Sequence, residues 1–163
     1  MDELAMQILS ELLPAEKEIA VQKAVHPSDV DHWTPAVLLE RAAYLRQMAR
    51  HGDGAAGETL KEFPRHAAML SVRSRDGQAE VHENFADLFY VIDGRATLLT
   101  GGKVVGAVGV APGETRGVGI EGGVRQELRS GDLVHVPAGV PHQMLVPGEH
   151  TFTAFVLKIQ EKE

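Results

Sequence analysis

The residues with the most evident capacity for chemistry are Glu80, His82 and Asp87, which lie close together in the segment EVHENFAD. On a strand, Glu80 and His82 point to the same face because side chains alternate with a period of two. Asp87 begins the apolar run DLFYVID, where a carboxylate is costly to bury without a cationic or metal partner. If the chain bends between the two runs, Asp87 returns to the face of His82. The pattern therefore indicates either a metal-binding carboxylate or an aspartate that caps a turn.

A second candidate is His142, in the segment GDLVHVPAGVPHQM. Turn signals at 131–132 and 137–139 bracket a short strand, and Pro141 stiffens the approach to His142. A histidine fixed in this way loses little conformational entropy when it binds a metal. The alternative is a hydrogen-bonded core histidine. For His135, in the same segment, we expect a structural role.

The other five histidines lack a partner at a recognisable ligand spacing, and we interpret them as surface or capping residues: His26, His32, His51, His66 and His150. The chain has no cysteine. Any metal must therefore be held by imidazole and carboxylate groups.

The amino-acid composition and net charge of the chain limit the kinds of molecule that it is expected to bind. The 163 residues have a formal charge of -7 and are 44% hydrophobic, which is typical of one globular domain. An acidic surface repels phosphate backbones and anionic lipids, so we expect neither nucleic acid nor a membrane as partner. The opening MDELAMQILSELLP is acidic, unlike a signal peptide. We therefore expect a cytoplasmic protein.

The N-terminal part, 1–57, has helical periodicity. Apolar spacing predicts helices over 4–13 and 15–25. A third helix is predicted from Thr34 as the cap to Gly52 as the stop. Its apolar stripe consists of Val37, Leu38, Ala42, Leu45 and Met48. These helices either cap the mouth of the barrel that the rest of the same chain is expected to form or pack on a second subunit.

From residue 58 to 163 the pattern changes to short apolar runs separated by turn signals. The predicted strands lie within 66–75, 79–83, 87–93, 95–100, 125–130, 133–139, 141–146 and 151–159. Turns are expected at 76–77, 94, 101–102, 131–132 and 147–148. The glycine-rich stretch 101–123 is predicted to be a long loop or ribbon. Many short strands at this spacing favour a sandwich or barrel.

The two chemical segments resemble the paired motifs of the cupin superfamily. The first motif is matched by Glu80-x-His82, four residues, Asp87, six residues and Gly94. The second is matched by Gly131, five residues, Pro137-x-Gly139, two residues and His142. The resemblance implies a mainly β, double-stranded β-helix (jelly-roll) barrel that carries an α-helical N-terminal extension.

The resemblance also implies a divalent metal site with His82, Asp87 and His142 as ligands and Glu80 as a fourth. The family generally uses three histidines and one glutamate, so Glu80 stands for a histidine and Asp87 for the glutamate. Val146 stands where an asparagine is usual. Two imidazoles with one or two carboxylates suit Fe, Mn, Ni or Zn, and the added carboxylate shifts the preference towards harder ions.

The function implied is a metal-dependent enzyme on a small molecule, oxygenase-like or isomerase-like. The alternative is a non-enzymatic ligand-binding or sensing protein with a degenerate metal site. Small cupins are commonly dimers, so a homodimer is expected. A phosphorylated substrate would require arginines that converge in space, and the candidates are Arg73, Arg75, Arg95 and Arg116. We interpret Phe85, Phe89 and Tyr90 as core or pocket walls.

Overall fold

The computed structural model describes residues 30–162, so the helices predicted over 4–13 and 15–25 lie outside the described residues. One helix and twelve strands are present within that range. Their bounds are α3 (Pro35–His51), β1 (Ala55–Glu62), β2 (His66–Arg73), β3 (Ala79–His82), β4 (Phe85–Thr100), β5 (Lys103–Val105), β6 (Val108–Ala111), β7 (Glu114–Gly117), β8 (Gly119–Glu121), β9 (Val124–Arg129), β10 (Leu133–Val136), β11 (His142–Leu145) and β12 (Phe152–Gln160).

The helix α3 confirms the third predicted helix. The Thr34 hydroxyl accepts a hydrogen bond from the Val37 amide, and the Gly52 amide donates to the Met48 carbonyl. The buried stripe is Leu38, Ala42, Leu45 and Ala49. Val37 and Met48, which the predicted stripe included, are exposed. The compact unit that contains α3 and the strands begins at Thr34. Residue 57, where the helical N-terminal part was expected to end, lies inside β1.

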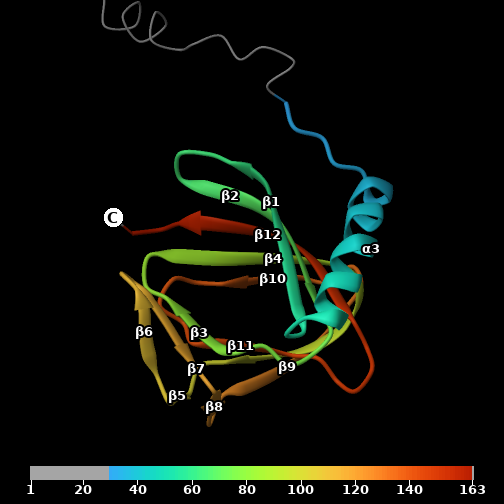
Figure 1. Ribbon diagram of the computed structural model, residues 1–163. Helices are drawn as coiled ribbons and strands as arrows, with labels where there is room; N and C mark the ends of the chain where they lie inside the picture. The colour runs from blue at the N-terminus through green and yellow to red at the C-terminus, as the bar shows by residue number, and fades with distance from the viewer. Residues whose placement is uncertain (1–29, 163) are drawn as a thin grey trace, which may run out of the picture. The chain divides into compact units, whose positions relative to one another are not determined.

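The strands form one curled antiparallel sheet in the order β1-β2-β12-β4-β11-β3-β7-β6 (Figure 1). Strands β9 and β10 both pair with the long strand β4, and β5 and β8 form a separate two-stranded ribbon. Val91, Leu98 and Phe152 are fully or almost fully buried in the core that the curled sheet encloses. A curled antiparallel sheet of this kind confirms the expected mainly β barrel.

At Gly94 the prediction of a turn was wrong, because β4 runs through this residue without a break. Gly94 has φ +82°, and a Cβ atom there would lie 1.9 Å from the Thr151 carbonyl oxygen. The pairing of β4 with β12 shifts in register beside this glycine, between Thr153 and Ala154. Gly94 therefore bends one strand so that its first half pairs with β10 and its second half with β9.

Residues 101–123 form a ribbon of short strands, β5 to β8, which is one of the two forms predicted for this stretch. Within it, β7 pairs with β3 in antiparallel register. Glu114 lies opposite His82, and Arg116 lies opposite Glu80. The ribbon thus delivers two charged side chains to the strand that carries the first motif.

Candidate metal site

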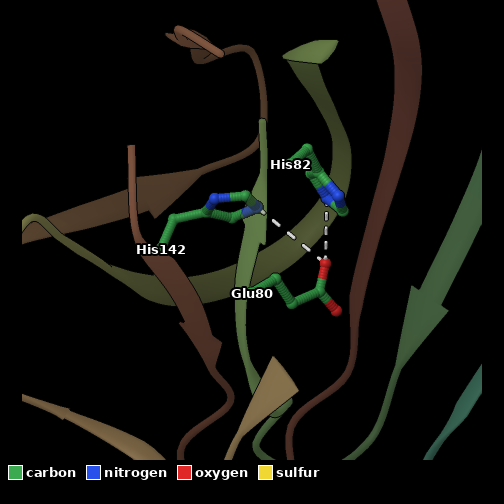
Figure 2. Close-up of side chains that lie close together, drawn as sticks. All are labelled: Glu80, His82 and His142. Carbon is green, nitrogen blue, oxygen red and sulfur yellow. Dashed lines mark ion pairs between the residues drawn. The ribbon is translucent and has the colours of Figure 1, made fainter. Parts of the chain in front are cut away.

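Three neighbouring strands bring the candidate ligands together. His142 begins β11, and its register partner on β3 is Glu80. His82 ends β3, and alternation along that strand turns both side chains to one face. Figure 2 shows Glu80, His82 and His142 pointing toward one another. Asp87 lies inside β4 and is buried, so the alternative that it caps a turn was wrong.

The distances between these side chains suit a single ion. His82 Nε2 lies 3.3 Å from both Glu80 Oε2 and Asp87 Oδ2. His142 Nε2 lies 3.5 Å from Asp87 Oδ2 and 3.9 Å from Glu80 Oε2. Two ligand atoms bound to one ion at roughly 2.1 Å are at most about 4.2 Å apart. Among the described residues, Glu80, His82 and His142 offer ligand atoms that all lie within 4.8 Å of one another, which is close to what one metal ion can bridge. Asp87 lies beside both imidazoles but outside this group of three.

Hydrogen bonds to the outer nitrogens orient both imidazoles. His82 Nδ1 lies 2.5 Å from Glu114 Oε2, and His142 Nδ1 lies 3.1 Å from the Val140 carbonyl oxygen. Both partners can only accept, so each Nδ1 donates and each Nε2 is turned to the cluster. His142 Nε2 is buried and has no hydrogen-bond partner among the described residues. A lone pair that faces two carboxylates is unfavourable unless a cation or proton lies between them, so this arrangement fits a metal ion.

The electrostatics of the cluster favour charged carboxylates. Burial alone would raise the pKa of Glu80, but His82, Arg116 and Arg73 hold that pKa at about 2. Burial would likewise raise the pKa of Asp87, whereas His142, His82 and Lys158 keep it well below its usual value. For His82, burial lowers the pKa, but Asp87 and Glu80 raise it to about 9. Without a metal, a proton on His82 therefore partly neutralises the two carboxylates.

Three cationic side chains also contact the carboxylates. Arg73 Nη2 lies 3.4 Å from Glu80 Oε1, and Arg116 Nη1 lies 3.0 Å from Glu80 Oε2. Lys158 Nζ lies 3.0 Å from Asp87 Oδ1, its register partner across β12 and β4. Neither Lys158 nor Glu114 was predicted from the sequence, because only the strand register places them beside the motif residues.

A cavity of about 190 Å³ opens beside this cluster. Its polar lining includes Arg73, Glu80, Asp87 and Arg116, whereas Arg75 and Arg95 do not line it. Phe89 forms part of the wall, as expected, but Tyr90 is 46% exposed and its assignment to the core or pocket was wrong. The cavity is smaller than the roughly 300–1,000 Å³ typical of sites for drug-sized ligands, so it suits a small molecule.

The contact between His82 and Glu114 supports a prediction about metal affinity. Replacing Glu114 with alanine removes the acceptor that orients the His82 ring, so we expect divalent metal affinity to fall by about 10- to 100-fold. Glutamine keeps an acceptor oxygen, so Glu114→Gln should lie between the wild type and the alanine variant. Isothermal titration calorimetry measures the three affinities.

The matched control for this prediction is Glu83→Ala. Glu83 follows His82 directly and is exposed, so its removal changes the net charge by the same amount without loosening the ring. An equal loss of affinity in the Glu83 and Glu114 variants would contradict an orienting role for Glu114.

The comparisons with known proteins identify the fold. No protein-family model matches the chain, and no curated protein matches it either. Among solved structures, a protein from Thermus thermophilus aligns with a TM-score of 0.50 at 17% identity, over 71% of this chain and 93% of that one. The cupin domain of Cnp3 from Schizosaccharomyces pombe aligns with a TM-score of 0.50 at 11% identity, over 66% and 65%.

A third similar structure is a double-stranded β-helix protein from Klebsiella pneumoniae, with a TM-score of 0.49 at 16% identity, over 66% of this chain and 77% of that one. The match to the cupin domain shows that the chain has the cupin fold, a double-stranded β-helix, which confirms the fold expected from the two motifs. Within residues 30–162, no helix is long and apolar enough to cross a membrane.

Proposed function

We propose that this chain binds one divalent ion, Fe, Mn, Ni or Zn, through Glu80, His82, Asp87 and His142, and acts as a metal-dependent enzyme on a small molecule. The observation that carries the proposal is the buried His142 Nε2 atom, which has no hydrogen-bond partner in the described range and faces two carboxylates. An ion held by two imidazoles and carboxylates supplies Lewis-acid or dioxygen chemistry, in keeping with an isomerase-like or oxygenase-like reaction.

The chain's own residues would prepare the site for that chemistry. Glu114 and the Val140 carbonyl hold the two rings with Nε2 turned inward. Phe89, Phe152 and Val156 line the cavity and reduce the water around the reacting groups. Arg73 and Arg116 border the same space and would orient a polar substrate.

The second candidate function is a binding or sensing protein without catalysis. The ion pairs of Arg73 and Arg116 with Glu80, and of Lys158 with Asp87, support it. They supply positive charge to the carboxylates even without a metal. Such a protein would keep the cavity for an organic ligand and bind a metal weakly or in a closed site.

An exchangeable coordination position separates the two candidates, because catalysis needs one and a closed site has none. Mn(II)-loaded protein can be examined by water-proton relaxation. We expect a clear relaxation enhancement over free Mn(II), from bound water that exchanges with the solvent. Bound Mn(II) without any enhancement would contradict the enzyme proposal and favour the second candidate. Protein from which Mn(II) has been removed by a chelator is the control.

A further inference from the structure

Cationic side chains line the cavity beside the candidate metal site, and two of them have a buried nitrogen without a hydrogen-bond acceptor in the described range. Arg73 of β2, Arg116 of β7 and Lys158 of β12 all line it. Arg116 Nη1 and Lys158 Nζ are buried atoms, and neither has a hydrogen-bond partner within residues 30–162. Each lies 3.0 Å from a carboxylate oxygen, but without hydrogen-bonding geometry. Since a buried donor without an acceptor is costly, these atoms suit an anionic group inside the cavity.

The charges of the metal-loaded cluster lead to the same conclusion. The three cations are balanced by three carboxylates, Glu80, Asp87 and Glu114. Imidazoles that bind a metal are neutral. A divalent ion therefore leaves the loaded cluster with an excess of two positive charges. The three cationic side chains are partly buried, at 22 to 29% exposure, and solvent screens such charges less than those on an open surface, so an anionic ligand is favoured over a neutral one.

The remaining wall of the cavity is apolar. It consists of Met69, Phe89, Met144, Phe152 and Val156. A fully hydrated anion, such as inorganic phosphate, would leave this wall without a partner. A ligand with a charged end and a hydrocarbon body would contact both parts of the lining.

The position of Arg73 is set by its surroundings. A Cβ atom on Gly77 would lie 2.7 Å from Arg73 Nη1. The absence of a side chain at Gly77 therefore leaves room for the guanidinium of Arg73 in this position. In the described range, the Arg73 side chain makes one hydrogen bond, to Glu80. A guanidinium has five N–H donors, so Arg73 retains donors for a ligand while it contacts Glu80.

We propose that the metal-loaded cavity binds a small carboxylic acid, with its carboxylate against Arg73 and Arg116 and its hydrocarbon body against the apolar wall. This inference rests on the proposed function, because the excess positive charge comes from the bound metal. It names the substrate class of that site as an organic acid.

The test uses the Zn(II)-loaded full chain and two probes of nearly equal shape, 3-methylbutanoate and its neutral amide, 3-methylbutanamide. Calorimetry should show the acid binding at least about tenfold tighter than the amide, since charge-assisted bonds to arginine require the anion. Acetate should bind at least about tenfold more weakly than 3-methylbutanoate, because it lacks the hydrocarbon body.

Two variants separate a role in anion binding from a role in folding. Arg116→Gln should lower the affinity for 3-methylbutanoate about tenfold and leave that for the amide unchanged. The same variant should bind Zn(II) as tightly as the wild type or more tightly, because it removes a cation that lies 3.0 Å from Glu80. Gly77→Ala should also weaken acid binding, by displacing the Arg73 guanidinium while keeping its charge. The control is Arg125→Gln, on the exposed side of β9.

Each contrary outcome has a separate meaning. Wild-type protein that binds Zn(II) but binds the acid and the amide equally would overturn this inference alone. If acetate binds as tightly as 3-methylbutanoate, the apolar wall does not contact the ligand, and the proposed ligand class is overturned. Arg116→Gln protein that loses Zn(II) and acid together would show a structural role and overturn the assignment. Wild-type protein that binds no Zn(II) would overturn the proposed function and this inference with it.

Discussion

Replacing His142 with alanine is expected to lower divalent metal affinity by at least about 100-fold, the largest functional effect that we predict. The imidazole of His142 is 6% exposed and supplies one of the two nitrogens directed into the cluster. Its loss leaves Glu80 and Asp87 with one nitrogen ligand between them. Equilibrium dialysis against each of the four candidate ions, followed by elemental analysis, measures the change.

The control for this prediction is His135→Ala. His135 lies on β10, is 48% exposed and pairs with Glu161, away from the cavity lining. Circular dichroism should show both variants folded. A folded His142→Ala protein that keeps the metal content of the wild type would contradict the assignment of His142 as a ligand.

The second large effect concerns the fold. Replacing Gly94 with alanine is expected to lower the free energy of unfolding by at least about 3 kcal/mol, enough to unfold many small domains at moderate temperature. The residue has φ +82°, and a Cβ atom would lie 1.9 Å from the backbone oxygen of Thr151. A backbone atom cannot move aside as a flexible side chain does, so β4 and the segment before β12 must separate. Urea unfolding followed by circular dichroism gives the change.

Gly101→Ala is the matched control, since Gly101 has φ +72° but nothing within 4 Å of the added atom. This variant isolates the backbone strain, and we expect it to lower the free energy of unfolding by about 1 kcal/mol. Similar losses for both variants would show that the close approach to Thr151 contributes nothing to the effect.

The fold was predictable because its turn signals are local. Glycines at 101, 102 and 131 have positive φ values and lie at the turns that the sequence signals. Strand β1 was not predicted, since its sequence AAGETLKE lacks an alternation of apolar and polar residues. It lies at the edge of the sheet, where most of its positions are exposed. In the sequence Gly94 has the pattern of a turn, because a glycine that bends a strand and one that ends it look alike.

Only those residues of the candidate site that belong to the two motifs could be predicted from the sequence. The fixed spacings of the motifs single out Glu80, His82, Asp87 and His142, and the register of β3 and β11 places Glu80 opposite His142. Glu114 and Lys158 come from β7 and β12, whose registers no local pattern reveals. Among four arginines that could have converged, Arg73 and Arg116 line the cavity, and this outcome depends on the folded ribbon rather than on spacing.

The central claim is that this cluster holds one divalent metal ion, and metal content tests it most directly. The protein would be purified without an affinity metal, dialysed separately against Fe(II), Mn(II), Ni(II) and Zn(II), and analysed for metal per chain. The account predicts close to one ion per chain for at least one of these metals. Less than about a tenth of an ion per chain with all four, in protein shown to be folded, would contradict it.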